Sequence, residues 1–260
     1  MLQSRECEPR FRSDLRRGTH QSVRRDGALG ERFRMSVTVI ATAVLLAACS
    51  SGTHAQRNSP SAFHVVPVTG TAAGGGYGYW QQRFWQLVFS QPSVPACATA
   101  TGPDSQTVGL LNGGKLGVVN ATCTEPAGRA VYVAVNSVEC STFAGNHGLF
   151  GPGNGTQTLT SVAQLPACAS QGWPGTTFSA TVDGKTVDLS ALLAASQVFP
   201  IDVITNNDFG FNAHGQGRSA SYGSGLLLTG LSAGTHLIHT LAAYPPQSQT
   251  WDDTFTVHVT

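Results

Sequence analysis

The sequence predicts a mainly β protein, an antiparallel β-sandwich of jelly-roll or immunoglobulin-like topology with one or two short helices. Three observations carry this prediction. Only 11% of the 260 residues are charged, whereas 30 are glycine and 13 are proline, which is typical of a loop-rich β chain. Short apolar stretches alternate with turn residues. One of them, residues 130–135, is apolar on both faces and therefore needs cover on both sides of a sheet.

The N-terminal part carries the features of an export signal. Residues 36–48 are an apolar run too short for a comfortable membrane span, and Arg32 and Arg34 precede it. We therefore expect a signal peptide over 35–48, which ends at Cys49.

The residues Leu46-Ala47-Ala48-Cys49 resemble the lipobox of bacterial lipoproteins. That resemblance implies diacylation of the Cys49 thiol, cleavage before it and acylation of the new amino group, so the mature chain would be held on a membrane. Ordinary secretory cleavage beside an incidental cysteine is the alternative. We expect an exported lipoprotein on the periplasmic or cell-surface face. In a bacterium with two membranes, Ser50 in place of Asp favours the outer one.

The remaining domain boundaries follow from composition. Residues 1–34 are rich in arginine and lack an apolar period, which indicates an unstructured leader or a translation start assigned too early. Residues 49–60 form a polar tether and 61–260 one folded domain. Up to Cys49 nine Arg face five acidic residues, and after it six Lys or Arg face nine, giving +4 and −3. The folded part is therefore unsuited to nucleic acid, and its expected partners are the membrane and a glycan or another envelope component.

The four cysteines of the folded part predict disulfides, because an exported chain enters an oxidising compartment. Cys97, Cys123, Cys140 and Cys168 allow three pairings. We predict Cys97 with Cys123 and Cys140 with Cys168, since the strand over 130–135 carries Cys123 and Cys140 away from each other. A zinc site is the alternative, but no C-x-x-C pair exists, so we expect neither a metal nor a cofactor.

The first half of the domain predicts strands around one aromatic helix. Residues 62–68 read as a strand, and residues 77–91 repeat aromatic side chains at helical spacing until Pro92. We expect this stripe to pack on a sheet and to cover the central strand, rather than to form a ligand platform; burial of Trp80 and Trp85 decides between the two.

A hairpin is predicted over 107–111 and 116–122, around Asn112-Gly113-Gly114. Its residues Gly109 to Leu116 imitate a phosphate-binding loop, but Leu116 stands where Ser or Thr must bind magnesium, and a hairpin is the wrong context.

The second half predicts further strands and one short helix. Pro200 favours an edge or a bulge for its strand, and Asp183-Gly184 favours a tight turn. The predicted elements are a glycine-rich loop at 145–155, a helix at 159–168, a hairpin at 177–183 and 185–189, a strand at 197–205, a polar loop at 206–217 and strands at 219–231, 235–243 and 254–259.

Three motifs together resemble a widespread family of uncharacterised exported bacterial proteins. They are the aromatic helix from Tyr77 to Pro92, the run C-T-E-P-A-G-R-A-V-Y-V-A-V-N-S-V-E-C from Cys123 to Cys140, and G-L-S-A-G-T-H-L-I-H from Gly230 to His239. The resemblance implies export and this fold, and brings no assigned reaction. The chain departs from the family where aromatic pairs are expected, with Gly109-Leu110-Leu111 and Val131-Tyr132.

Four residues are candidates for a ligand site. Asn136 and Glu139 end the central strand just before Cys140, so a rigid element holds them near the glycine-rich loop. Glu139 would act as a general acid or a ligand contact, or else cap the strand end. Asp208 and His214 share a polar loop that could bind calcium or a sugar, or else consist of solvated turn residues.

Two further patterns have ordinary structural explanations. His236 and His239 lie three apart on a predicted strand and thus face opposite sides, so we expect one buried, hydrogen-bonded histidine and one surface histidine. Ser219 to Gly223 nearly match a nucleophile elbow, but Ser219 stands where glycine belongs and the segment continues as a strand.

The sequence favours a non-catalytic, lipid-anchored envelope protein whose β-sandwich binds a surface ligand. An envelope hydrolase acting through Glu139 or residues 206–217 is the first alternative. A structural or adhesive surface protein is the second. The sequence leaves the oligomeric state open.

Overall fold

The computed structural model describes residues 63–113, 117–143, 161–172, 174–207 and 214–260. The leader (1–34), the signal peptide (35–48), the tether with Cys49 (49–60) and the loop at 145–155 lie outside these ranges. Within Gln56–Thr260, which forms one compact unit, the described residues are mostly in strands of two sheets, with two short α-helices. Neither helix has the length and hydrophobicity that a membrane span requires.

The larger sheet has the strand order β1-β10-β5-β3-β2, and β8 and β9 pair with free parts of the long β10. Its strands are β1 (His64–Val65), β2 (Cys97–Thr101), β3 (Thr107–Asn112), β5 (Ala130–Ser141), β8 (Leu193–Ala195), β9 (Phe199–Val203) and β10 (Gly215–Thr229).

The smaller sheet has the order β4-β12-β11-β6-β7. Its strands are β4 (Gly117–Glu125), β6 (Thr177–Val182), β7 (Lys185–Val187), β11 (Gly234–Tyr244) and β12 (Gln249–Val259). The helices are α1 (Tyr77–Ser90) and α2 (Leu165–Ser170), with short 3-10 turns at Val162–Gln164, Leu189–Leu192 and Pro245–Gln247.

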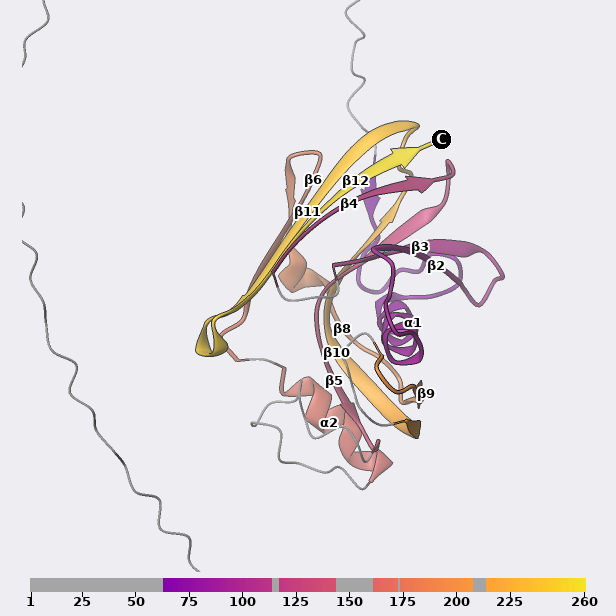
Figure 1. The fold of residues 1–260 in the computed structure, drawn as a ribbon. Coiled ribbons are helices and arrows are strands. Elements are labelled where there is room, and N and C mark those ends of the chain that lie inside the picture. The colour runs from indigo at the N-terminus through magenta and orange to yellow at the C-terminus, as the bar shows by residue number, and fades with distance from the viewer. Residues whose placement is uncertain (1–62, 114–116, 144–160, 173, 208–213) are drawn as a thin grey trace, which may run out of the picture. The chain divides into compact units, whose positions relative to one another are not determined.

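The central strand is β5, which lies between β10 and β3 as predicted. Val131 and Val133 are fully buried in one core that also contains Ile238 of β11 and Phe255 of β12. Figure 1 shows α1 on one side of β5 and β10 and the smaller sheet on the other. Because both faces of β5 are covered, an apolar residue is favourable at every position of its first half.

Helix α1 is stabilised by its aromatic residues rather than by its ends. Its N-terminus has neither a side-chain cap nor an acidic residue in the first turn. Tyr77, Trp80 and Trp85 are buried, so the aromatic stripe is core, as predicted. The Trp80 indole N–H donates to the Gly75 carbonyl at 2.9 Å, and the Tyr77 hydroxyl donates to the Val66 carbonyl at 2.6 Å. Burial raises the pKa of Tyr77 to about 12, so this hydroxyl stays a donor.

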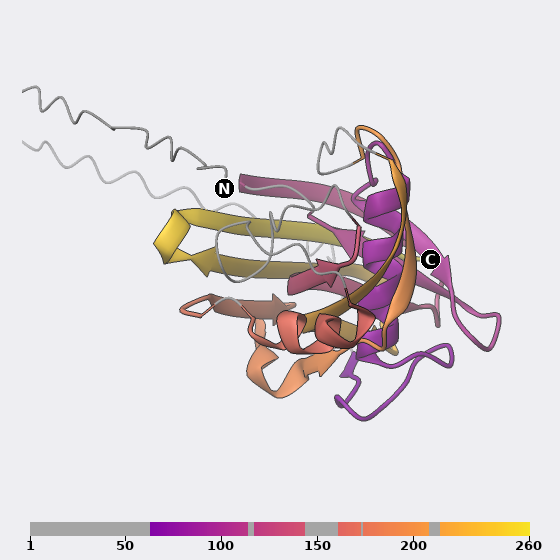
Figure 2. The same ribbon diagram turned by 90° about the horizontal axis from the view of Figure 1, so that it is seen from below.

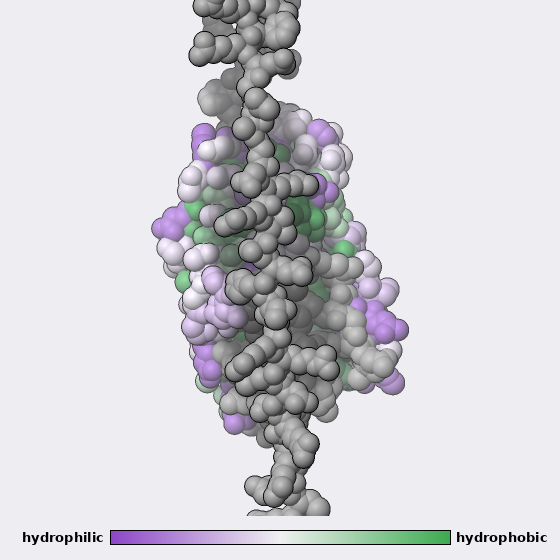
Figure 3. Space-filling view, turned by 60° about the vertical axis from the view of Figure 1, so that its left-hand side comes forward, coloured by the Kyte–Doolittle hydropathy of each residue, from purple (hydrophilic) through white to green (hydrophobic). Residues whose placement is uncertain are grey.

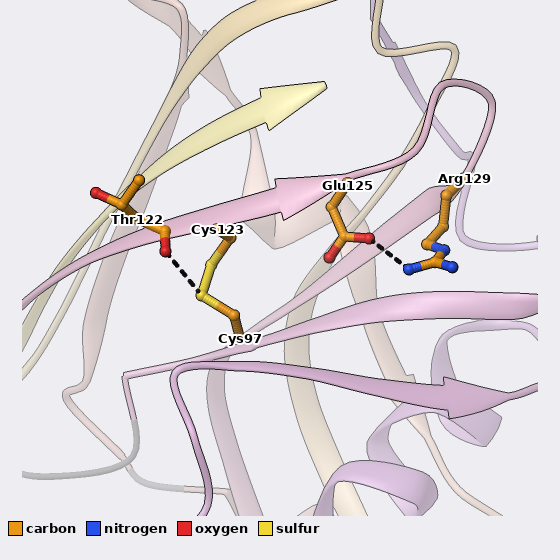
Figure 4. The surroundings of a disulfide bond; sticks show 5 residues. All are labelled: Cys97, Thr122, Cys123, Glu125 and Arg129. Carbon is orange, nitrogen blue, oxygen red and sulfur yellow. Dashed lines mark hydrogen bonds and ion pairs between the residues drawn. A yellow bond between two sulfur atoms is a disulfide. The ribbon is translucent and has the colours of Figure 1, made fainter. Parts of the chain in front are cut away.

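Both predicted disulfides are confirmed. Cys97–Cys123 joins β2 of the larger sheet to β4 of the smaller one, and Figure 4 shows the ion pair of Glu125 and Arg129 nearby. Cys140–Cys168 joins β5 to α2, where Leu165 packs into a small core around the bridge.

The predicted hairpin over 107–111 and 116–122 is wrong. Strand β3 pairs in parallel with β5, and β4 pairs in parallel with β12, so the chain passes from one sheet to the other after Asn112. Gly113 permits this passage, because a Cβ there would meet the Asp253 carboxylate oxygens within 2.1 Å. The fold is therefore mainly β but not purely antiparallel; its jelly-roll or immunoglobulin-like type stays a prediction.

The other predicted elements differ mainly in their bounds. The hairpin with Asp183-Gly184 is confirmed as β6 and β7, and Pro200 lies in β9, which pairs with β10 alone among the described strands. The predicted helix at 159–168 is α2, which begins later, at Leu165, after a 3-10 turn. Strand β10 begins at Gly215, within the predicted polar loop. Figure 2 shows α1 beside the curved β10, with the strands of the smaller sheet extending away from the helix.

Candidate functional site

A groove of about 570 Å³ lies beside α1. One wall is the exposed face of α1, the second is formed by β2 and β3, and the third by β9 and the start of β10. These elements lie far apart in the sequence and meet because the larger sheet carries both β2–β3 and β9 around the helix. The polar lining residues are Arg83, Gln86, Ser90, Thr99, Asp202, Gln216 and Arg218.

The groove combines this polar lining with apolar walls. Leu87 of α1 and the exposed Pro200 of β9 supply apolar surface, whereas the lining residues Leu110 and Ile201 are almost fully buried. Gln86 lies three residues after Arg83 on the same face of the helix, and the Arg83 Nη1 donates to its Oε1 at 2.9 Å. Apolar walls with a few fixed polar groups are typical of a small-ligand site.

Two arginines give the groove its charge. The described part of the chain contains four Lys or Arg residues. Of these, Arg129 forms an ion pair with Glu125 at 3.0 Å, and the Lys185 ammonium lies 5.4 Å from the centre of the Phe63 ring. Arg83, Arg218 and Lys185 form no ion pair with a described carboxylate, and of these three Arg83 and Arg218 line the groove.

A bulge in β5 separates the two predicted site residues Asn136 and Glu139. Ser224 of β10 lies opposite Asn136, but the next residue, Gly225, lies opposite Ala134, so Val135 is an extra residue on β5. The bulge reverses the side-chain alternation beyond it. As a result, Asn136 faces α2 whereas Glu139 faces α1. Strand β5 also continues beyond the predicted 130–135 and runs to Ser141, so both residues lie within it.

Glu139 belongs to a buried polar network between β5, β10 and α1. Its side chain is 2% exposed and accepts a hydrogen bond from the fully buried Ser219 hydroxyl. Next to it, the Ser221 hydroxyl donates to Gln81 Oε1 at 3.3 Å, and Gln81 Nε2 donates to the Gly223 carbonyl at 2.7 Å. Glu139 does not line the groove. It satisfies a hydroxyl within the domain, which is closer to the predicted capping role than to the predicted general acid.

Asn136 lines a smaller pocket of about 190 Å³ on the opposite face of the larger sheet. Its other walls come from α2, the start of β6 and the middle of β10, including Phe178 and Tyr222. Thr176 contributes a buried hydroxyl without a hydrogen-bond partner. This pocket lacks a charged residue in its lining and has about a third of the groove's volume, so the groove is the stronger candidate.

The remaining predicted site residues do not assemble into a second site. Asp208 lies outside the described residues, and His214 is exposed directly before β10. The described ranges contain no group of three or more His, Cys, Asp or Glu side chains placed to hold a metal ion.

The two histidines of β11 are placed as predicted. His236 is buried, and its ring nitrogens lie 2.8 Å from Asp183 Oδ2 and 2.8 Å from the Ser232 carbonyl oxygen. His239 is 39% exposed and lies 2.8 Å from Asp252 Oδ1. The serine segment from Ser219 to Gly223 lies within β10, without the strand-to-helix turn of a nucleophile elbow.

The sequence pattern does not predict that Arg83 and Arg218 line a common groove. One signal for Arg83 was available, because α1 contains no acidic residue that could pair with it across a helical turn. Nothing local marks Arg218, whose place in the lining of the same groove depends on how β10 and α1 pack.

Comparisons with known proteins leave the family open. No family model and no curated sequence matches the chain. Among solved structures it is weakly similar to the cysteine protease inhibitor EhICP2 from Entamoeba histolytica, at 10% identity and a TM-score of 0.20, over 55% of this chain and 93% of that one. It is equally weakly similar to amebosin (14%, 0.20, 55% and 100%) and to PbICP-C in complex with falcipain-2 (10%, 0.21, 59% and 97%). At these TM-scores the likenesses carry no argument about function.

Proposed function

We propose that this chain is a non-catalytic, lipid-anchored envelope protein that binds a glycan or another envelope component in the groove beside α1. The observation that carries the proposal is the groove itself, whose lining combines apolar residues with residues that bear amide, hydroxyl and guanidinium groups. Its one acidic lining residue, Asp202, has no second carboxylate within the lining with which it could form a glycosidase pair.

Several features of the sequence support the envelope location. The lipobox-like residues before Cys49 and the polar tether after it would place the domain outside the membrane. Two disulfides suit a chain that folds in an oxidising compartment. The resemblance to uncharacterised exported bacterial proteins points the same way. The visible part of the face in Figure 3 carries both hydrophobic and hydrophilic residues.

Filling the groove tests the binding function. Ala100 of β2 lines the groove and shares the face of Leu110, whereas Thr101 on the same strand is exposed and does not line it. We expect Ala100→Trp to weaken saturable binding to envelope glycans by tenfold or more, because the indole occupies ligand space, and Thr101→Trp to leave it unchanged. Calorimetric titration against fractionated envelope glycans measures both.

The same glycans test the two alternatives. Turnover that Glu139→Gln abolishes would establish the hydrolase and overturn the proposal. If the chain shows no binding and no turnover of these glycans, the result would favour a structural or adhesive protein.

The anchor has a separate test. We expect cells that express the chain to incorporate labelled palmitate into it, and Cys49→Ala to abolish this incorporation because the thiol carries the diacylglycerol. Label that persists in Cys49→Ala would refute the lipid anchor and leave the groove unaffected.

A further inference from the structure

We infer that His236 is a pH-sensitive switch, whose doubly protonated ring holds the turn of residues 230–234 and whose loss of a proton releases that turn. The switch lies in the smaller sheet and its connections, so it is independent of the groove and of any ligand there. It gives a buried histidine that the proposed function does not use a regulatory role in the domain.

Both ring nitrogens of His236 face oxygen atoms. Nδ1 lies 2.8 Å from Asp183 Oδ2, and Nε2 lies 2.8 Å from the Ser232 carbonyl oxygen. A backbone carbonyl can only accept a hydrogen bond, and so can an ionised carboxylate. A neutral imidazole donates from one nitrogen and accepts at the other, so it would turn a lone pair toward one of the two oxygens. The geometry therefore requires a proton on each ring nitrogen.

A proton on Asp183 instead of the ring would leave the proton count unchanged. The acid would then donate from Oδ2 to Nδ1, and the ring would donate from Nε2 to Ser232. The ionised acid is favoured, because Asp183 Oδ1 also accepts from the Leu237 N–H at 2.8 Å, and such a bond stabilises a carboxylate. In both cases the folded pair holds one proton more than a neutral histidine beside an ionised aspartate.

Burial makes this extra proton important for the structure. His236 is 1% exposed, so water cannot take the place of either oxygen as a partner of the ring. Loss of one proton would leave a ring nitrogen and an oxygen, both acceptors, facing each other at hydrogen-bond distance, which is unfavourable in a buried site. One of the two contacts of the ring must then open.

The contact to Ser232 is the one that opens. Asp183 is fixed to β11, because its N–H donates to the Leu237 carbonyl and its Oδ1 accepts from the Leu237 N–H, both at 2.8 Å. Ser232 is exposed and lies between two glycines with positive φ, Gly230 (65°) and Gly234 (132°). Glycine tolerates a change of backbone conformation at both positions. The neutral ring therefore keeps its bond to the carboxylate and releases the turn.

The other titratable groups on the elements around His236 have contacts of their own. On β12 the residue opposite the histidine is Val257, which carries no charge. Among the described residues, Asp183 is therefore the acid in contact with the ring. The neighbouring titratable side chains and the groups they contact are Lys185 at the Phe63 ring, His258 at the Thr235 hydroxyl, Glu125 at Arg129, and His64 against Gly230.

The first test observes the ring protons directly, by NMR of the full chain labelled with nitrogen-15. Ring nitrogen shifts distinguish an imidazolium from either neutral tautomer, and the signals that His236→Gln removes belong to His236. We expect both ring nitrogens to be protonated at pH 7, and the amide signals of residues 231–234 to shift when the ring loses a proton at higher pH. Asp183→Asn should give a neutral ring protonated on Nε2, because an amide can donate to Nδ1.

The second test measures unfolding in urea between pH 7 and pH 9. An unfolded histidine is neutral above about pH 6.5, so the extra proton stabilises the folded state fully below that pH, and this stabilisation is lost as pH rises. We expect the unfolding equilibrium constant to rise with pH by up to tenfold per unit, which is the limit for one proton. His236→Gln should remove this rise. The matched control is His64→Gln, which removes an exposed histidine against the same turn and should keep the rise.

Three outcomes would overturn the switch. The first is a neutral His236 ring in the wild type at pH 7. The second is a ring that loses its proton while the amide signals of residues 231–234 stay unchanged, because the turn is then not released. The third is a pH response that His64→Gln removes and His236→Gln preserves. If His236→Gln fails to fold, the wild-type ring signals and the Asp183→Asn variant decide the question.

Discussion

Asp253 is a buried acid whose pKa is raised in the folded domain. It lies on the inward face of β12, is 3% exposed, and its Oδ1 has no hydrogen-bond partner. Burial raises the pKa of Asp253 to about 6; the neighbouring Asp252 raises it further, and His239 opposes the rise. Because an unfolded aspartate has a pKa of about 3.9, the folded state holds the extra proton between about pH 4 and pH 6.

This shift predicts a pH-dependent stability with a definite sign. The free energy of unfolding should fall as pH rises from about 4 through about 6, because ionisation of Asp253 disfavours the folded state. Two pKa units correspond to about 3 kcal/mol. We expect Asp253→Asn to be more stable than the wild type by up to about that amount at pH 7.5, and about equally stable at pH 4, in urea unfolding.

The exposed Asp202 is the control for this measurement, and Asp202→Asn should follow the wild-type pH profile. A difference between Asp253→Asn and the wild type that is the same at both pH values would rule out the proposed titration.

At the scale of single elements, β5 shows what an apolar pattern predicts and what it leaves undecided. Its first half is apolar at every position, which correctly predicted a central strand with cover on both faces. Beyond Val135 the apolar positions change parity, to Val138 and Cys140, and this change marks the bulge. This change of parity would have predicted that Glu139 faces α1 and that Asn136 faces the opposite side of the sheet.

The turn residues at the end of β3 likewise predict only part of the local structure. Asn112 and Gly113 favour any tight change of direction, and a hairpin is only the commonest one. Here the close approach to Asp253 requires glycine at 113, and β4 pairs with β12 from the C-terminal end of the chain. A partner about 135 residues away in sequence leaves no trace in a local pattern.

At the scale of the whole molecule, the sequence predicted those features that a single segment of the chain determines. The disulfide pairing was predictable because one strand separates Cys123 from Cys140 by its length. The groove was not, since its walls come from α1, β2 and β3, β9 and β10, and only the tertiary fold brings Arg83 and Arg218 to one cavity.

The two disulfides have different structural roles despite loops of similar length, 26 and 28 residues. Strand β2 ends the order of the larger sheet and β4 ends that of the smaller one. Each edge strand has one neighbour in its own sheet, so Cys97–Cys123 is the covalent link between two edges. Cys140–Cys168 instead holds α2, whose six residues are too few for a helix that is stable by itself.

We therefore predict that removal of either disulfide destabilises the domain equally, and that each removal affects different local elements. Replacing either pair by alanine should lower the free energy of unfolding by about 3 kcal/mol, because the loops have similar closure entropies. In native-state hydrogen exchange, the Cys97→Ala, Cys123→Ala variant should lose protection in β2 and β4, and the Cys140→Ala, Cys168→Ala variant in α2, because removal of a link frees the element it held. Loss of α2 protection in the first variant, or of β4 protection in the second, would contradict this division, since each bridge would then stabilise the domain as a whole.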